Sequence, residues 1–355
     1  MRECAVRESK PRPNLGNFNP GRKPYTALLS LKKMVDTVTW VTNRLALGLF
    51  VFSCVLSLGA QTATWQPSPG HTQMPIWPTL VPDAQPVPGP ETITIDPNFR
   101  IAGKSVIGVS NVTLPTITVY SPAGTNTGAA ILVFPGGGFQ ELAIDLEGTE
   151  ICDWLTSAGI TCVLLKYRVP SLPYDWHCKC RPNGQAISTL ALEDAQRALG
   201  LVRFHASNWH IDPHKVGVLG FSAGGYLVAE ISTHFQHRLY PPVDAADRES
   251  CRPDFAVPIY PGHLWTGDHV DLNPRIHVAR DTPPTFLLQA ENDPVDPVQN
   301  SIAYFVALQQ ARVPAEMHLY PQGGHAFGLR RTDLPITEWP ALVEKWLRTI
   351  GITAK

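Results

Sequence analysis

The chain has 355 residues, of which 44% are hydrophobic and only 17% charged, and it contains 34 Pro and 27 Gly. This balance excludes a largely disordered protein, because disorder needs low hydrophobicity together with high net charge. The formal net charge of −1 argues against a nucleic-acid partner, and the length suffices for one large α/β domain or two small ones.

The first sixty residues are predicted to form a basic leader that ends in a signal peptide. Residues 1–33 carry eight Lys or Arg and two Glu, and residues 45–60 form a run without charge, LALGLFVFSCVLSLGA. That run is slightly shorter than the roughly 17–25 residues of a membrane span, and small residues follow it, as in secretory signals. We expect a secreted or periplasmic protein with its signal peptide within residues 34–60 and translation beginning at Met34. A retained anchor helix is the alternative.

Residues 61–90 form a Pro-rich segment that precedes the predicted catalytic domain, residues 91–355. Trp65–Pro90 contains eight prolines in 26 residues. Such a composition is typical of extended, polyproline-like chain. The segment is therefore either a linker or an arm that lies on the domain.

Alternating strand and helix patterns fill the rest of the chain. Two β-rich segments, SVIGVSNVT and TITVYS, come first, and continuous apolar runs follow, as expected for strands buried on both faces of a parallel sheet. These runs are AAILVFP, ITCVLLKY, KVGVLGF, FAVPIYP, TFLLQA and AEMHLYP. Helical spacing is found in residues 150–159, with Thr149 as the N-cap and Gly159 as the stop, and in Leu190–His205, Ala223–His234, Ser301–Ala311 and Trp339–Ile350. The alternation predicts a doubly wound, mostly parallel α/β fold with helices on both faces of the sheet.

Five cysteines remain after cleavage near residue 60. Cys152 and Cys162 lie in apolar patterns and are predicted to be packed core thiols. Cys178 and Cys180 lie in the loop WHCKCRPN, and Cys251 lies in another polar loop. A disulfide from that pair to Cys251 suits an oxidising compartment, although the spacing does not fix it.

A glycine run, PGGGF at residues 135–139, directly follows the predicted strand AAILVF. Residues without side chains allow backbone N–H groups to point at a ligand oxygen, such as the oxyanion of a tetrahedral intermediate. Gly137 and Gly138 are the candidate donors. On its own the run also fits a flexible turn, so its interpretation depends on the motifs that follow.

The segment GFSAG, Gly220–Gly224, follows the strand KVGVLGF and opens a helix. This is the strand–turn–helix context that the nucleophile motif G-x-S-x-G requires. Small flanking residues leave room for a tight turn, and the helix N-terminus favours developing negative charge. We predict that Ser222 is a nucleophile and that the N–H of Ala223 is a third oxyanion donor.

A nucleophilic serine of this kind needs a histidine and an acid, in the chain order Ser, Asp/Glu, His. Asp293 follows the end of the strand TFLLQA, where catalytic groups of open sheets gather, and Asp296 is the alternative. Two histidines come after it: His318 lies within a strand, and His325 lies in a Gly-rich loop that can reach the serine. We therefore predict that Asp293 and His325 complete a triad.

Other aromatic and histidine residues give weaker predictions. Phe139, Tyr226 and Trp265 are candidate walls of the substrate pocket, and each also suits the core. No metal site is expected, because the cluster HCKC at residues 177–180 lacks a second ligand pair. The histidines at 205, 210 and 214 do not predict a metal site either, because they straddle a helix end. No organic cofactor is expected either.

The motifs PGGGF, GFSAGG, ENDPV and GGHAFGL resemble those of secreted bacterial α/β-hydrolase esterases related to acetylxylan esterases and to the hormone-sensitive-lipase-like group. The resemblance covers roughly residues 78–351 and implies the α/β-hydrolase fold and a serine mechanism. Pro135 stands where the lipase-like group usually has His. Acetylxylan-esterase-like members also have Pro at this position. The WHCKC loop, residues 176–180, looks like an insertion over the pocket.

We expect a serine esterase that hydrolyses short-chain carboxylic esters, above all acetyl esters on carbohydrate, through an acyl-enzyme on Ser222. The alternatives are a feruloyl-type esterase, a serine peptidase of the prolyl-oligopeptidase type, and a carbohydrate-binding protein with a hydrolase fold. The peptidase normally carries a large propeller domain, a dienelactone-hydrolase-like enzyme would have Cys at position 222, and a binding protein would have lost a triad member. The expected partner is a small ester or acylated carbohydrate, with no nucleic acid and no stable membrane insertion after signal cleavage.

Removal of the leader changes the charge of the protein. Residues 1–60 hold nine of the 29 Lys and Arg and three of the 30 Asp and Glu, which leaves 20 against 27, a net charge of −7. An acidic hydrolase favours a neutral substrate, such as an acylated sugar, over an anionic one.

Overall fold

The computed structural model describes residues 64–174, 180–181, 185–267 and 269–354. The chain divides after Ser57 into two units, and the second, Leu58–Lys355, contains every described residue. The predicted leader and signal peptide, residues 1–60, lie outside the described residues. Within the described part of the chain, no helix has the length and apolar character needed to cross a membrane.

An eight-stranded sheet forms the centre of the second unit, in the order β1-β4-β7-β5-β8-β9-β10-β11. β1 and β4 pair antiparallel to their neighbours, and the strands from β7 onward are parallel. The strands are β1 (Gln73–Pro75), β4 (Thr116–Tyr120), β5 (Ala130–Phe134), β7 (Thr161–Lys166), β8 (Val216–Phe221), β9 (Ala256–Ile259), β10 (Thr285–Ala290) and β11 (Ala315–Tyr320). Every residue of β5, β7, β8, β9 and β10 is buried, which explains their continuous apolar sequences.

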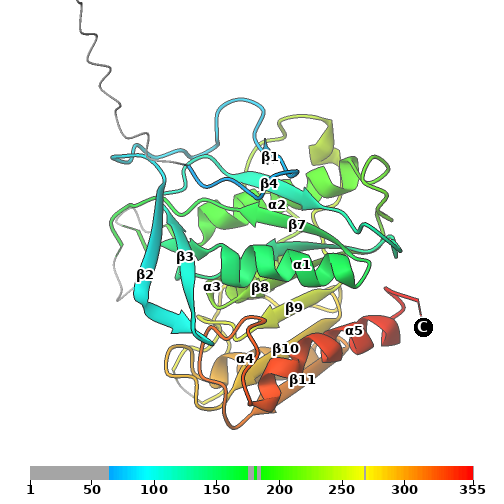
Figure 1. Ribbon diagram of the computed structural model, residues 1–355. Coiled ribbons are helices and arrows are strands. Elements are labelled where there is room, and N and C mark those ends of the chain that lie inside the picture. Colours follow the sequence, from blue (N-terminus) through cyan, green and yellow to red (C-terminus); the bar gives the residue numbers. More distant parts are fainter. Residues whose placement is uncertain (1–63, 175–179, 182–184, 268, 355) are drawn as a thin grey trace, which may run out of the picture. The chain divides into compact units, whose positions relative to one another are not determined.

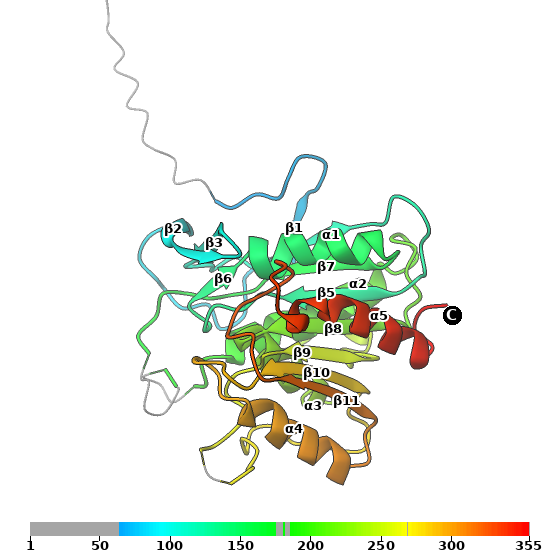
Figure 2. The same cartoon turned by 60° about the horizontal axis from the view of Figure 1, so that its bottom comes forward.

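Helices cover both faces of this sheet. α1 and α5 lie on one face, and α2, α3 and α4 lie on the other (Figures 1 and 2). The helices are α1 (Glu150–Ser157), α2 (Thr189–Phe204), α3 (Ala223–Thr233), α4 (Gln299–Gln310) and α5 (Trp339–Thr349). Their ends lie within two residues of the predicted ends, and the predicted doubly wound, mostly parallel fold is confirmed.

Thr149 lies at the predicted N-cap position of α1, but its side chain does not cap the helix. Thr149 makes no capping hydrogen bond, because a π-helical turn, η1 (Asp145–Thr149), runs directly into the helix. Thr149 itself has helical dihedral angles, with φ −66° and ψ −38°. Carbonyl groups of η1 therefore accept N–H groups at the start of α1 in place of a capping side chain, as in the bond from Glu150 to Asp145.

A second, three-stranded antiparallel sheet was only partly predicted. It has the order β2-β3-β6 and consists of β2 (Thr92–Ile101), β3 (Lys104–Ser110) and β6 (Glu141–Ala143). β2 is exposed along almost its whole length and has a register shift between Ile95 and Arg100, so its sequence lacks the apolar pattern of a core strand. β6 comes directly after the glycine run, which ties this sheet to the predicted oxyanion loop.

The Pro-rich segment lies on the domain as an arm. Its strand β1 extends the edge of the main sheet through β4. Trp65 and Trp77 are buried, and the indole Nε1 of Trp77 donates a hydrogen bond to Asp194 at 2.9 Å. Of the two alternatives for this segment, the structure thus shows the arm.

Both predictions about cysteines are wrong. Cys152 of α1 and Cys162 of β7 form a disulfide, with their Cα atoms 5.1 Å apart, a separation that suits such a bond. Cys180 is also disulfide-bonded, whereas Cys251 carries a free, buried thiol, so the bond considered to Cys251 does not form. Two cysteines in adjacent apolar elements face each other, which their separate patterns did not reveal. Cys178 and most of the predicted insertion 176–180 lie outside the described residues.

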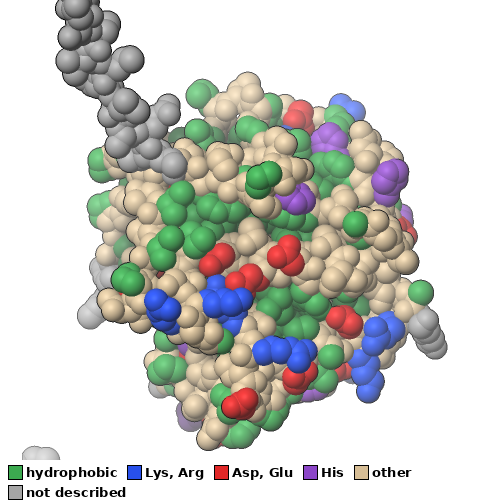
Figure 3. Space-filling model, in the orientation of Figure 1, with side chains coloured by type: hydrophobic (Ala, Val, Ile, Leu, Met, Phe, Trp, Pro, Cys, Tyr) green, Lys and Arg blue, Asp and Glu red, His purple; other side chains and the backbone are tan. Residues whose placement is uncertain are grey.

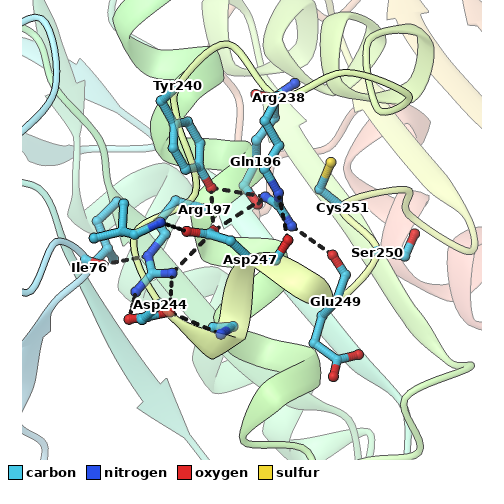
Figure 4. Close-up of polar contacts among 12 residues, drawn as sticks. Ile76, Gln196, Arg197, Arg238, Tyr240, Asp244, Asp247, Glu249, Ser250 and Cys251 are labelled. Atoms are coloured by element: carbon cyan, nitrogen blue, oxygen red, sulfur yellow. Dashed lines mark hydrogen bonds and ion pairs between the residues drawn. The ribbon is translucent and has the colours of Figure 1, made fainter.

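A buried arginine on α2 joins the arm to the segment that follows α3. Arg197 donates from Nε to the carbonyl of Ile76 at 2.9 Å and from both terminal nitrogens to the carboxylate of Asp244 (Figure 4). Its Nη1 also lies 3.1 Å from Asp247, whose side chain is buried and accepts a hydrogen bond from Tyr240. Arg197 thus links the arm, α2 and the segment after α3 through its own hydrogen bonds and ion pairs.

We expect Arg197→Ala to lower the free energy of unfolding by about 3–5 kcal/mol, because it leaves the buried carboxylate of Asp247 without its main counter-charge. Equilibrium unfolding in urea measures the change. The matched control is Arg331→Ala, which removes an exposed ion pair with Glu338 and is expected to cost less than about 1 kcal/mol. Equal effects of the two substitutions would contradict this account of the cluster.

Candidate active site

Ser222 lies in the sharp turn between β8 and α3. Its backbone has φ +51° and ψ −117°, a region that non-glycine residues rarely occupy and that costs energy. Neighbouring backbone groups hold this conformation: the N–H of Ser222 donates to Ile259 at 3.1 Å, and its carbonyl accepts from Gly262 at 3.2 Å. The turn therefore presents the hydroxyl group above the carboxyl ends of the parallel strands.

The glycines that flank the serine are required by close backbone packing. A Cβ atom at Gly224 would collide with the carbonyl oxygen of Phe134 at the end of β5. A Cβ atom at Gly220 would collide with the carbonyl oxygen of Gly224. The G-x-S-x-G pattern thus follows from the approach of α3 to β5 and from the tightness of the turn itself.

The structure brings together the three side chains that the sequence analysis assigned to a triad. Nε2 of His325 lies 3.0 Å from Oγ of Ser222, and Nδ1 lies 2.7 Å from Oδ2 of Asp293. Oδ1 of Asp293 accepts hydrogen bonds from the N–H groups of Val295 and Asp296, each at 2.9 Å. The carboxylate is therefore fixed with its second oxygen directed at the imidazole, an arrangement suited to moving a proton from the serine.

Two residues that the sequence analysis did not single out hold the loop of His325. Oδ1 of Asn292 accepts hydrogen bonds from the N–H groups of Gly323 and Gly324, at 3.0 and 2.9 Å. Arg330, which is buried, pairs with Glu150 of α1 at 2.9 Å and with Asp145 of η1 at 3.0 Å. Figure 3 shows basic and acidic side chains next to each other on the face over α1. The position of Asn292 beside Asp293 was the signal that could have identified it.

The surroundings of His325 favour its protonated form. Burial by itself would lower the pKa of the imidazole, but the hydrogen bond that His325 donates to Asp293 and the negative charges of Asp293, Asp296 and Glu147 outweigh it and raise the pKa above the usual 6.5. Only the neutral imidazole can accept the serine proton. Catalysis that depends on His325 therefore requires a pH above this raised pKa.

We expect kcat/KM for ester hydrolysis to fall tenfold per pH unit on the acid side of a single pKa that lies above 6.5, because protonation of His325 removes the base. A profile between about pH 5 and pH 9 measures it. Asp296→Asn removes one of the negative charges that raise this pKa and is expected to move this limb to lower pH. An activity plateau that continues well below pH 6.5 would rule out His325 as the base.

The glycine run forms one wall of the site. Gly137 and Gly138 have φ +131° and +64°, and both line the cavity in front of Ser222. The N–H of Gly136 donates to Glu147 at 2.6 Å and is thus already paired. Ala223 is the first residue of α3, where backbone N–H groups have no acceptor within the helix. Gly137 and Gly138 thus line the same cavity as Ser222, and Ala223 directly follows it; that their N–H groups hold an oxyanion stays a prediction.

Glu147 of η1 is a buried carboxyl group that sequence analysis missed. Oε2 accepts the N–H of Gly136, and Oε1 accepts the hydroxyl of Tyr260 at 2.9 Å. Burial raises the pKa of this carboxyl group, against the lowering effects of Tyr260, His325 and Gly136. The ring of Tyr260 contacts the ring of His325 edge-on, with centroids 5.0 Å apart. Glu147 and Tyr260 therefore connect the glycine run to the histidine; no sequence signal marked them.

A cavity of about 550 Å³ opens in front of Ser222 and His325, a volume typical of small-molecule sites. The β2–β3 hairpin forms its outer wall. Its lining consists of Thr94, Asp96, Phe99, Val106, Gly108, Gly137, Gly138, Glu141, Ala143, Leu146, Glu147, Ser222, His263, Val295, Asp296, His325 and Ala326. Four of these described residues are Asp or Glu, and none is Lys or Arg, so the described lining disfavours anionic ligands.

The three predicted pocket residues, Phe139, Tyr226 and Trp265, are not among the described residues that line this cavity. Phe139 has φ +58°, which turns its side chain into the core, where it contacts the ring of Tyr226. His263 stacks on Phe139 and lines the cavity in its place. Trp265 donates from Nε1 to the carbonyl of His269 instead. The pocket prediction is therefore wrong.

Asp296, the alternative acid, occupies a different position from the one considered. Its Oδ2 accepts a hydrogen bond from Oγ of Ser222 at 3.2 Å and lies 3.8 Å from Nε2 of His325. It is thus on the serine side of the imidazole, whereas Asp293 contacts Nδ1. His318, the other candidate base, lies on β11 and pairs with Glu316. Within the described residues, no group of three His, Cys, Asp or Glu is arranged to hold a metal ion.

Two family models match consecutive parts of the chain. The BD-FAE family matches residues 119–257, and the prolyl oligopeptidase family matches residues 261–350. The chain is 29% identical over 228 residues to an acetylxylan esterase of Xylanibacter ruminicola, a match that covers 57% of this chain and 42% of the relative. It is also 29% identical over 216 residues to endo-1,4-beta-xylanase B of Butyrivibrio fibrisolvens, covering 55% and 32%. The chain spans less than half the length of these two curated relatives.

Solved structures match over almost their whole length. An acetyl ester-xyloside bifunctional hydrolase from Caldicellulosiruptor lactoaceticus is 32% identical, with a TM-score of 0.61, and the match covers 80% of this chain and 97% of that one. A putative carboxylesterase from Lactobacillus plantarum is 27% identical, with a TM-score of 0.52, covering 69% and 98%. Both the architecture and the sequence are thus similar to those of ester hydrolases.

Proposed function

We propose that this chain, which belongs to the esterases of the α/β-hydrolase fold, hydrolyses short-chain carboxylic esters and acts above all on acetyl esters of carbohydrate. One observation carries the proposal: the hydroxyl of Ser222 lies within hydrogen-bond distance of His325, which Asp293 orients, at the base of an open cavity. The similar proteins that are named acetylxylan esterase and acetyl ester-xyloside hydrolase support the substrate class.

The proposed reaction has two half-reactions. His325 takes the proton of Ser222 as Oγ attacks the ester carbonyl, and the N–H groups of Gly137, Gly138 and Ala223 stabilise the oxyanion. His325 then gives the proton to the leaving alcohol, and an acyl-enzyme remains on Ser222. A water molecule repeats these steps, which releases the carboxylic acid and restores the serine.

The charge of the site supports a neutral substrate. The cavity contains the carboxylates of Asp96, Glu141, Glu147 and Asp296 among its described lining, and the chain without residues 1–60 has a net charge of −7. An anionic acyl or alcohol group would be repelled there. Hydroxyl groups of a sugar, in contrast, can donate hydrogen bonds to carboxylates.

Export from the cytoplasm is part of the proposal. The disulfide between Cys152 and Cys162 and the bonded state of Cys180 suit an oxidising compartment. The charge-free run at residues 45–60 suits a signal peptide. N-terminal sequencing of protein recovered from the periplasm or medium tests this, and recovery of the uncleaved chain in the cytoplasm would contradict it.

The test of function measures acid release from p-nitrophenyl esters of increasing acyl length and from acetylated xylan, with wild type and Ser222→Ala. We expect the highest kcat/KM for acetyl and propionyl esters, and lower values for a succinyl half-ester than for the butyryl ester of similar length. Preference for feruloylated xylan would favour the feruloyl-type alternative. Xylan binding without hydrolysis would favour the binding-protein alternative.

A peptidase of the prolyl-oligopeptidase type is the second candidate. The match to that family covers residues 261–350, which include Asp293 and His325. The two activities share these groups, so a prolyl peptide p-nitroanilide belongs in the same assay. Cleavage of this amide with no turnover of acetyl esters would favour the peptidase.

A further inference from the structure

Asp296 places a second carboxylate at the reacting end of the site. Its Oδ2 lies 3.2 Å from Oγ of Ser222 and 3.8 Å from Nε2 of His325, and the side chain lines the cavity. The proposed esterase mechanism does not use this group. A carboxylate in contact with the nucleophile nevertheless influences what can bind there.

The backbone of Asp296 is anchored on both sides. Its N–H donates to Oδ1 of Asp293 at 2.9 Å, and its carbonyl accepts from Nε2 of Gln289 at 2.6 Å. The carboxylate packs on Gly262, where a Cβ atom would lie only 2.5 Å from Oδ1. Gly262 also bonds to the carbonyl of Ser222, so the carboxylate and the nucleophile share one rigid support.

Asp296 and His325 are both acceptors for the single proton of the Ser222 hydroxyl. A serine hydroxyl donates one hydrogen bond, whereas a carboxylate can accept several. When Ser222 directs its proton to His325, which the reaction requires, Oδ2 of Asp296 no longer receives it. A hydroxyl group of the substrate can then donate to Oδ2 in its place.

The leaving group is the part of the substrate nearest to Asp296. Nε2 of His325 must reach the ester oxygen to protonate it, so this oxygen lies close to Nε2 in the reacting complex. Oδ2 of Asp296 is 3.8 Å from the same nitrogen. A hydroxyl on the carbon next to the one that bears the ester is therefore within reach of Oδ2 at a charge-assisted distance of about 2.6 Å.

We propose that Asp296 is a specificity-determining residue that accepts a hydrogen bond from a free hydroxyl vicinal to the scissile ester, so that the enzyme selects esters of vicinal diols, such as partly acetylated sugars. This inference rests on the proposed esterase function and adds to it which acetyl groups are removed. An acetyl group whose neighbouring hydroxyl is also acylated is a poor substrate, because that position then has no proton to donate.

The experiment compares two esters that differ only in this hydroxyl, 2-hydroxyethyl acetate and 2-methoxyethyl acetate. Wild type is expected to show a ratio of kcat/KM values of about tenfold or more in favour of the hydroxyl compound, as a hydrogen bond to a charged group provides. Asp296→Ala is expected to bring the ratio close to one, and Asp296→Asn to an intermediate value, because its amide oxygen accepts without a charge. The ratio does not depend on the folded fraction of a variant, since both esters are measured with one preparation.

Two comparisons make the test specific. Ethyl glycolate and ethyl methoxyacetate carry the same difference on the acyl side, and Asp96→Ala removes another carboxylate of the same cavity. A wild-type ratio near one would overturn the inference, and so would a ratio that Asp296→Ala leaves unchanged. A loss of preference confined to the acyl-side pair, or an equal loss of preference in Asp96→Ala, would overturn it as well. Hydrolysis of none of these esters by wild type would overturn the proposed function as well.

Discussion

Ser222→Ala is expected to lower kcat for acetyl ester hydrolysis by a factor of about 10⁴ to 10⁶, because it removes the hydroxyl group that forms the acyl-enzyme. The backbone conformation at this position is strained for serine and alanine alike, so the variant is expected to unfold at the same temperature as wild type. KM is expected to change little, since the cavity walls remain. Steady-state kinetics on p-nitrophenyl acetate and a thermal unfolding curve measure these quantities.

The matched control for this variant is Ser157→Ala. Ser157 is exposed at the end of α1, where its hydroxyl donates to the carbonyl of Trp154. We expect wild-type kcat for this substitution. Retention of most activity by Ser222→Ala would contradict the assignment of the nucleophile. The same activity in a second, independent preparation excludes a contaminating esterase.

Asp293→Asn is expected to lower kcat by about 10⁴, with little change in KM. An asparagine can keep the hydrogen bonds from Val295 and Asp296 through its oxygen, and it then turns its NH₂ group toward Nδ1 of His325. The imidazole must accept that hydrogen bond at Nδ1 and carry its own proton on Nε2. It then cannot accept the proton of Ser222.

The comparison with Asp296→Asn tells the two carboxylates apart. Asp296 does not contact Nδ1, so its substitution is expected to affect the choice of ester far more than kcat on p-nitrophenyl acetate. Asp281→Asn, on an exposed loop, serves as the surface control. A larger loss of kcat in Asp296→Asn than in Asp293→Asn would assign the triad acid to Asp296.

The elements that position the site were predictable because their sequence patterns are local. Strands such as β5 and β8 are continuous apolar runs, and the glycines around Ser222 mark a turn with no room for side chains. The order of serine, acid and histidine then limited the candidates to a few residues. His325 was separable from His318 because one lies in a Gly-rich loop and the other in a strand.

The features that sequence analysis missed depend on contacts between distant segments. Glu147 and Tyr260 are separated by more than a hundred residues, yet Glu147 raises the pKa of His325 and Tyr260 contacts its ring, and nothing in their local sequence shows this. β2 is exposed and has no apolar pattern, although it forms a wall of the cavity. Phe139 was expected in the pocket because it follows the glycine run, but its positive φ turns it into the core.

The central claim is that Ser222 carries the acyl group during turnover. Acid quenching of the enzyme during hydrolysis of p-nitrophenyl acetate, followed by peptide mapping by mass spectrometry, tests it most directly. We predict an acetyl group on the peptide that contains Gly220–Gly224, attached to Ser222. Two results would contradict the account. One is acetylation of a different residue that forms and decays at the catalytic rate. The other is turnover by Ser222→Ala at the wild-type rate without any acetylated peptide.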